Sequence, residues 1–191
     1  MQELKDRILK DGQAIGDDII KVDSFLNHQI DVTLLSAIGK EFRDRFADTD
    51  ANKILTIEAS GIAIACAAAW HMGGIPVVFA KKAAPNTMTD GYYFTEITSF
   101  TKRSVSRVIV SKKYLGPEDR VLIIDDFLAH GEAASGLAGL AKQSGAKICG
   151  FGAVIEKEFQ GGGDKLRGLG YRVESLAVVS SIEDGKIKFS Y

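Results

Sequence analysis

Two adjacent acids, Asp125 and Asp126, directly follow a run of four aliphatic residues at 121–124. Such a run is typical of a buried parallel strand, which delivers the polar residues after it to the carboxyl edge of the sheet. Ionised carboxylates only accept hydrogen bonds, and the neighbouring hydroxyls of a ribose are two donors. Negative charge there would also stabilise a ribose whose C1 becomes cationic. The pair therefore predicts a ribose site rather than an ordinary strand end, with Asp125 and Asp126 as the catalytic residues.

A loop of small residues around a glycine comes next, before a helical pattern. It comprises Ala129, His130, Gly131, Glu132 and Ala133. Small side chains let backbone N–H groups approach phosphate oxygens, and the N-terminus of the following helix favours an anion. Glu132 suits such a site if it faces outward from the first helical turn, where an acid complements the helix dipole. We therefore predict that this loop binds the phosphate of a sugar phosphate. A plain strand-to-helix turn is the alternative.

The rest of the chain alternates between helix-like and strand-like patterns. Helices are expected near residues 4–9, after an N-cap at Asp31, up to about residue 71, and at 132–144 with Gly145 at the end. Strands are expected at residues 53–58, 76–80, 120–124, 148–156 and 173–182. This alternation predicts one α/β domain over residues 1–191, with a parallel sheet and right-handed crossovers.

Residues 83–106 interrupt this alternation. The segment is long, polar and rich in Thr and Ser, and a structureless loop of this length would be unusual in a compact domain. Its β-branched and aromatic residues predict a two-stranded excursion, in which residues 92–100 pair with residues 107–114. We expect this excursion to close over a bound ligand.

The composition of the chain excludes some classes of function. Lys and Arg total 24 against 25 for Asp and Glu, which excludes a broadly basic nucleic-acid surface. Cys66 and Cys149 have apolar or small neighbours and are predicted to be buried free thiols. The first seven residues are too charged for a secretory signal, and no apolar run is long enough to span a membrane. The histidines are too scattered for a metal cluster. We therefore expect a cytoplasmic protein without metal ligands of its own.

Residues 121–134 place Asp-Asp-x-x-Ala-x-Gly-x-Ala after the aliphatic run, which resembles the phosphoribosyl pyrophosphate (PRPP) motif of the type I phosphoribosyltransferases. Other segments resemble the bacterial members of this family that act on xanthine, namely residues 21–31, 56–63, 76–82, 154–157 and 170–177. The resemblance implies the type I phosphoribosyltransferase fold, a mainly parallel α/β sheet flanked by helices. It also implies a small hood made by residues 1–30 and 155–191, and a flexible β-ribbon loop at residues 83–106.

The same resemblance implies a purine-salvage enzyme that joins xanthine to PRPP and releases xanthosine 5′-monophosphate and pyrophosphate. It assigns PRPP to residues 129–133 and xanthine to Ile20, Asn27 and Lys157. Mg²⁺ is the expected cofactor, bound mainly through PRPP. The expected assembly is a homodimer that binds neither nucleic acid nor membranes. The chain departs from the family in two places: the phosphate loop there commonly reads Ala-Asn-Gly-Gln-Ala, with Asn and Gln where this chain has His130 and Glu132, and a Leu stands where this chain has Ile20.

Further residues receive roles on the same basis. The loop from Glu58 to Gly61 is assigned to pyrophosphate, and a helix cap by Ser60 is the alternative. One of Lys81 and Lys82 is expected to neutralise pyrophosphate, and Phe159 is expected to stack on the purine ring. Two other functions stay open, which are an enzyme acting on hypoxanthine or guanine and a PRPP-sensing regulator that binds nucleic acid.

Overall fold

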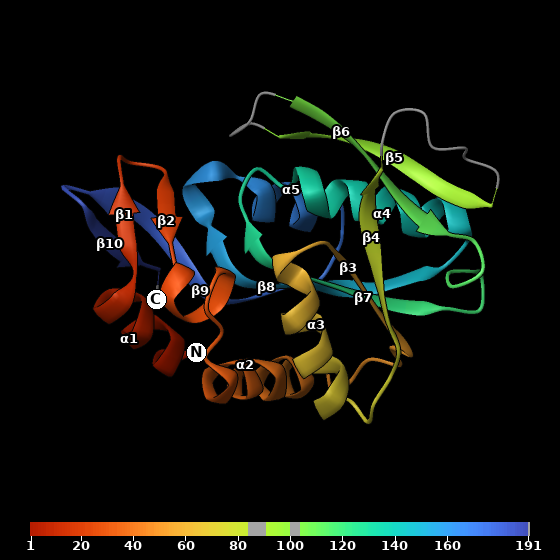
Figure 1. The fold of residues 1–191 in the computed structure, drawn as a ribbon, viewed down its shortest axis with the longest axis horizontal. Coiled ribbons are helices and arrows are strands. Elements are labelled where there is room, and N and C mark those ends of the chain that lie inside the picture. Colours follow the sequence, from red (N-terminus) through yellow and green to blue (C-terminus); the bar gives the residue numbers. More distant parts are fainter. Residues whose placement is uncertain (84–90, 100–103, 191) are drawn as a thin grey trace.

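The computed structural model describes residues 1–83, 91–99 and 104–190. Within them the main sheet has the strand order β10-β9-β8-β7-β3-β4-β6-β5 (Figure 1). Its strands are β3 (Lys53–Ile57), β4 (Val77–Ala83), β5 (Tyr92–Ser99), β6 (Ser104–Ser111), β7 (Arg120–Leu128), β8 (Lys147–Lys157), β9 (Val173–Glu183) and β10 (Lys186–Phe189). Neighbouring strands from β9 to β4 run parallel, and the pairs nearer the two edges run antiparallel.

Helices cover both faces of this sheet (Figure 1). The α-helices of the described residues are α1 (Gln2–Asp11), α2 (Val32–Arg45), α3 (Ser60–His71), α4 (Glu132–Ser144) and α5 (Gly162–Gly168). The first three pack on one face with Phe25 and Phe42, and the last two pack on the other with Leu137 and Leu166. Residues 121–124 of β7 are buried between the two layers, which explains their continuous aliphatic run. The predicted mainly parallel sheet flanked by helices is confirmed.

The α2 helix begins where the sequence predicts. Asp31 Oδ1 accepts hydrogen bonds from the backbone N–H groups of Thr33 and Leu34, each at 3.1 Å, as an N-cap does. Further along, a Cβ built on Gly39 would lie 2.6 Å from the carbonyl oxygen of Ala67 on α3. The two helices therefore approach each other closely at Gly39, and this contact helps to position α3 against the sheet.

The predicted two-stranded excursion is present. β5 and β6 pair in antiparallel register from Tyr92–Ser111 to Ser99–Ser104. The second strand begins at Ser104 rather than at residue 107, because residues 104–106 already pair with residues 97–99 of β5. Residues 84–90 and 100–103, which the predicted flexible loop includes, lie outside the described residues.

The excursion lies against helix α4 in this structure (Figure 1). Gln143 Nε2 donates a hydrogen bond to the carbonyl oxygen of Phe94 at 2.9 Å. A Cβ built on Gly136 would lie 2.6 Å from the side chain of Ile97. The described part of the ribbon is thus packed on the outer side of α4.

The two ends of the chain lie side by side at one edge of the sheet (Figure 1). The amino group of Met1 donates to the carbonyl oxygen of Leu176 at 2.6 Å, and Lys5 Nζ donates to that of Ser190 at 3.0 Å. A hairpin of β1 (Gln13–Ile15) and β2 (Ile19–Lys21) lies in the same region. The sequence did not predict this hairpin, nor β10 and α5, because elements this short carry no extended periodic pattern.

The prediction of two buried thiols is wrong. Cys66 is exposed on α3, and Cys149 is partly exposed, with its Sγ 3.7 Å from Asp50 Oδ1. The residues of α3 are apolar or small on almost every side of the helix. The sequence around Cys66 therefore does not indicate which side of the helix is exposed. Within the described residues, no helix is long and apolar enough to cross a membrane.

The close contact between α2 and α3 gives a test of the packing. We expect Gly39→Ala to lower the free energy of unfolding by about 1–3 kcal/mol, because the added methyl group meets backbone rather than a flexible side chain. Denaturant unfolding measures the change. The exposed neighbour offers a control, Lys40→Ala, which is expected to stay within about 0.5 kcal/mol of the parent chain. Equal stability of the Gly39→Ala and parent chains would show that the helices have room to separate.

Candidate active site

Asp125 and Asp126 lie at the carboxyl end of β7, in the middle of the parallel part of the sheet. Asp126 is buried and Asp125 is partly buried. Asp125 Oδ1 accepts a hydrogen bond from the backbone N–H of Asp126 at 3.0 Å, and Asp126 Oδ1 accepts one from Phe127 at 2.9 Å. Each carboxylate is thus held by the next peptide group in the chain.

The surroundings of Asp125 disfavour its ionised form. Burial raises the pKa of Asp125 well above its usual range, and the negative charge of Asp126 raises it further. The ammonium group of Lys82 acts in the opposite direction, but more weakly. A ligand that donates hydrogen bonds or brings positive charge would relieve this crowding, since it favours the ionised form.

The loop between β3 and α3 lies directly beside this pair. A Cβ built on Gly61 would lie 2.8 Å from Asp125 Oδ1 and 2.2 Å from Thr56 Oγ1, so only glycine fits there. Glu58 Oε1 accepts a hydrogen bond from the backbone N–H of Lys82 at 2.6 Å, which ties the loop to β4. The peptide bond after Glu58 is cis. Ser60 is the first residue of α3 and Ala59 stands at the N-cap position, so Ser60 is not the cap of this helix.

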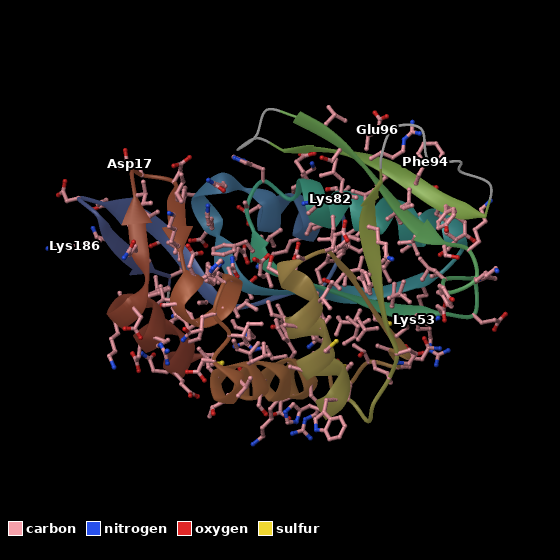
Figure 2. All side chains as sticks on the ribbon, in the orientation of Figure 1. Asp17, Lys53, Lys82, Phe94, Glu96 and Lys186 are labelled. Carbon is pink, nitrogen blue, oxygen red and sulfur yellow. The ribbon has the colours of Figure 1, made fainter. Side chains whose placement is uncertain are left out.

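The two lysines at the end of β4 point in different directions. The charge of Lys82 lowers the pKa of Asp125, and Figure 2 shows where Lys82 lies on β4. The Lys81 ammonium lies 5.5 Å from the ring centre of Phe79, on the same strand. Successive side chains of a strand alternate between its two faces. Lys82 is therefore the lysine of the two whose charge acts on Asp125.

The loop after β7 leads directly into helix α4 through a glycine turn. Gly131 has a φ of +81°, a left-handed conformation that glycine adopts without strain, and α4 begins directly after it. Glu132 Oε1 lies 3.5 Å from Lys165 Nζ on α5, and both side chains are partly exposed. The acid thus faces outward from the first turn, as predicted. His130 is exposed, with its Nδ1 3.2 Å from the carbonyl oxygen of Gln160.

Lys157, at the end of β8, lies near two apolar residues. Its Nζ donates to the carbonyl oxygen of Asp18 at 2.6 Å and lies 5.7 Å from the ring centre of Phe127. Burial lowers the pKa of Lys157, and the charge of Asp18 partly opposes this. Ile20 is buried in the hydrophobic core cluster against which Phe127 packs. Lys157 therefore lies beside Phe127 and beside the β1–β2 hairpin, whose second strand carries Ile20.

The other two predicted purine contacts lie on short helical turns. Asn27 ends the π-helix Asp23–Asn27 and is exposed. Phe159 lies on the turn Glu158–Gln160 and is 40% exposed. Both side chains are accessible to a ligand. Neither of them forms a hydrogen bond or a ring contact with Lys157 in the described part of the chain. Their roles stay predictions.

Two residues at the site escaped the sequence analysis. Thr56 is fully buried, and its Oγ1 has no hydrogen-bond partner within the described part of the chain, although it lies beside Gly61. Its signal was a hydroxyl in the middle of the apolar strand Lys53–Ile57. Phe127 was overlooked because it stands between the acids and the phosphate loop, where an aromatic ring has no role in holding a sugar phosphate.

Comparison with known proteins gives a consistent result, although no family model matches the chain. The xanthine phosphoribosyltransferase of Ruminiclostridium cellulolyticum is 55% identical over 190 residues and covers 100% of both chains. That of Clostridium novyi is 54% identical over 189 residues, which is 99% of both chains. That of Heliobacterium modesticaldum is 53% identical over 190 residues and again covers 100% of both.

Solved structures with lower sequence identity share the fold. The adenine phosphoribosyltransferase of Rhodothermus marinus matches with a TM-score of 0.75 at 18% identity, over 94% of this chain and 100% of that one. The adenine enzyme of Giardia lamblia, complexed with 9-deazaadenine, matches with a TM-score of 0.71 at 23% identity, over 84% and 85%. These likenesses show the type I phosphoribosyltransferase fold alone. The full-length identities above 50% show more: this chain belongs to the xanthine phosphoribosyltransferase family.

Proposed function

We propose that this protein transfers the 5-phosphoribosyl group of PRPP to xanthine and releases xanthosine 5′-monophosphate and pyrophosphate. The observation that carries the proposal is the position of the Asp125–Asp126 pair. Gly61 of the Glu58–Gly61 loop lies directly against Asp125, and the Ala129–Ala133 loop follows the pair closely in the chain, before α4. A ribose held at the pair would have a phosphate-binding loop within reach at each end. The full-length identity to xanthine phosphoribosyltransferases supports the same function.

The two aspartates act on the ribose. Their carboxylates accept hydrogen bonds from its two hydroxyls, which fixes the sugar and favours the ionised form of Asp125. When the bond between C1 and pyrophosphate lengthens, positive charge develops on the ribose ring. Fixed negative charge nearby stabilises that state more than the ground state, which lowers the barrier. Holding both substrates in line supplies much of the remaining acceleration.

The two loops divide the phosphates. In the Ala129–Ala133 loop, backbone N–H groups at the start of α4 bind the 5′-phosphate, assisted by the helix dipole. The Glu58–Gly61 loop receives the pyrophosphate, and the charge of Lys82 partly neutralises it. Glu132 does not repel the 5′-phosphate, because its carboxylate is turned toward Lys165.

Mg²⁺ is part of the proposal. Within the described residues, no group of three or more His, Cys, Asp or Glu side chains is arranged to hold a metal ion. The crowded Asp125–Asp126 pair would nevertheless favour a nearby cation, since the pKa of Asp125 is raised by burial and by its neighbour. We infer that the ion would be bound mainly through PRPP, with this pair nearby. Bound there, Mg²⁺ supplies charge neutralisation for the departing pyrophosphate.

Lys157 recognises the purine. Its ammonium donates to a carbonyl oxygen of xanthine in place of the Asp18 carbonyl, while Ile20 provides an apolar wall and Asn27 an amide for the polar edge. Phe159 stacks on the ring. Xanthine is an acidic base and loses its proton readily, so the reaction needs little help from a general base.

The remaining proposals concern the whole molecule. Residues 1–30 and 155–191 form the hood over the purine, which the contacts between the two ends of the chain support. The excursion at residues 83–106 excludes water when PRPP is bound; closure remains a prediction, because β5 lies against α4 here.

The working form is a cytoplasmic homodimer. Trp70 is 79% exposed and Val32 is 72% exposed, and a second copy of the chain would cover this apolar surface. Sedimentation of the purified chain tests whether it is a dimer.

Activity with each purine tests the proposed function directly. With PRPP and Mg²⁺, xanthine is expected to be converted with a higher kcat/KM than guanine, hypoxanthine or adenine, as followed by ultraviolet absorbance. A preference for guanine or hypoxanthine would correct the substrate, and no conversion of any purine would reject the enzyme class.

The aspartates give a sharper test. The double variant Asp125→Asn/Asp126→Asn is expected to lose transfer activity by a factor of about a thousand or more, because neutral amides do not stabilise a cationic ribose. Circular dichroism should show an intact fold. Asp184→Asn is a matched control at an exposed turn, where Asn tolerates the φ of +50°. Turnover comparable to that of the control would reject the catalytic role of the pair.

The raised pKa of Asp125 predicts an effect on stability. In the unfolded chain Asp125 ionises near its usual pKa, so between that value and the raised one the folded state binds more protons and stability falls as pH rises. Asp125→Asn removes this ionisation. We expect the variant to be more stable than the parent chain near neutral pH, with the gain shrinking as pH falls to about 4. Denaturant unfolding across this range measures it, and a variant that is less stable at neutral pH would contradict the assignment.

Lys157 provides a test of purine recognition. We expect Lys157→Ala to raise KM for xanthine about tenfold or more, in line with the loss of a charged hydrogen bond of about 1.5–3 kcal/mol. KM for PRPP should change much less. Lys147→Ala, at the exposed opposite end of β8, is the control. Equal losses for both substrates would argue against a contact between Lys157 and the base.

A further inference from the structure

A glycine at the start of α5 lies directly against the backbone of the phosphate loop. The backbone N–H of Gly162 donates to the carbonyl oxygen of Ala129 at 3.0 Å. A Cβ built on Gly162 would lie 2.3 Å from that oxygen and 2.6 Å from the backbone nitrogen of Gly131. Real Cβ atoms do not approach backbone this closely, because repulsion rises steeply inside van der Waals contact. The loop and α5 therefore fit together only because residue 162 has no side chain.

An ion pair beneath α5 fixes the position of this glycine. Both oxygens of Glu156 accept hydrogen bonds from Arg167, each at 2.8 Å, and Ser175 donates to one of them. Glu156 is 1% exposed at the end of β8. A Cβ built on Gly163 would lie 1.8 Å from Glu156 Oε1. The first turn of α5 thus rests on the buried carboxylate, and Arg167 fastens the end of the same helix to it.

The charge on Glu156 is maintained despite its burial. Burial acts to raise the pKa of Glu156, but the hydrogen bonds from Arg167 and Ser175 outweigh it and the pKa is lowered. A bidentate guanidinium–carboxylate pair is strong and directional. Buried ion pairs are often replaceable as far as stability is concerned. This pair joins the end of β8, which carries Lys157, to α5, which packs against the phosphate loop. Its position therefore suggests a role in the site besides any contribution to stability.

We propose that Gly162 and the Glu156–Arg167 pair are positioning residues that hold the Ala129–Gly131 backbone in the conformation that binds the 5′-phosphate of PRPP. This inference rests on the proposed function, in which the loop after β7 receives that phosphate. None of the three residues touches substrate. Gly162 is the back wall of the loop, and the ion pair keeps the wall in place. Substitution of Gly162, or loss of the ion pair, would displace the backbone N–H groups that bind the phosphate. The residues that contact the purine would stay in place.

The first experiment uses a matched pair of glycines on α5. Gly162→Ala adds a methyl group against the loop, whereas Gly168→Ala adds one at the other end of the helix, where a Cβ would meet nothing within 4 Å. We expect Gly162→Ala to raise KM for PRPP about tenfold or more, since displacements near 1 Å have such effects. KM for xanthine should stay within about twofold, and Gly168→Ala should change neither. An unchanged KM for PRPP, or an equal rise for both substrates, overturns the proposal.

The second experiment tests the ion pair with a matched arginine. Arg167→Met removes the partner of Glu156, and Arg172→Met removes a bidentate pair with Asp48 that lies elsewhere, at 2.7 and 2.9 Å. We expect a several-fold rise of KM for PRPP in Arg167→Met alone, with partial recovery in Arg167→Lys. A rise of the same size in Arg172→Met would show a general effect of stability and overturn the role of the pair.

A readout without substrate separates this inference from the proposed function. Hydrogen exchange of the backbone amides at residues 131–133 should be faster in Gly162→Ala than in Gly168→Ala or the parent chain, if the glycine holds the loop. Equal exchange in all three proteins overturns the inference whatever the substrate. If instead the parent chain neither binds nor uses PRPP, the proposed function fails, and with it the phosphate-positioning role.

Discussion

Two carboxylates held side by side at the end of a buried strand repel each other and lose hydration, and both effects work against folding. Burial and the charge of Asp126 raise the pKa of Asp125 well above its usual range. The positive charge of Lys82 lowers this pKa, but too weakly to offset the other two effects. Sites that keep such unfavourable charge are typical of binding and catalysis, because the ligand rather than the fold relieves the strain.

The rest of the fold places two loops around that pair. β7 lies between β3 and β8 in the parallel part of the sheet, so the loops after neighbouring strands meet at one edge, as in other open α/β sheets. Gly61 brings the loop after β3 into contact with Asp125, and Gly131 turns the chain from β7 into α4. Both the contact at Gly61 and the turn at Gly131 depend on a residue that has no side chain. The two helices that begin at these loops are buried on opposite faces of the sheet, and this packing holds the loops in place.

The sequence predicts the central part of this architecture well, because its signals are local. The run before Asp125, the cap at Asp31 and the glycine before α4 each determine their own backbone, and all three are found as expected. Contacts between distant residues have no such signal. The packing of Gly162 on Ala129 joins segments 33 positions apart, and the pair of Glu156 with Arg167 depends on a helix too short to be predicted. The exposure of Cys66 was also unpredictable, since the apolar helix around it gives no indication of which side faces the sheet.

The division of the site follows from the same geometry. In the proposed function, backbone at helix starts would hold the phosphate groups, carboxylates at a strand end the ribose, and Lys157 at the end of the next strand the purine. The central claim is that the Asp125–Asp126 pair and the loop after it bind an activated sugar phosphate. Calorimetric titration of the parent chain with PRPP in the presence of Mg²⁺ tests this most directly. The account predicts saturable binding at one site per chain, with xanthine not required; no heat of binding under these conditions, with the protein shown to be folded, would contradict it.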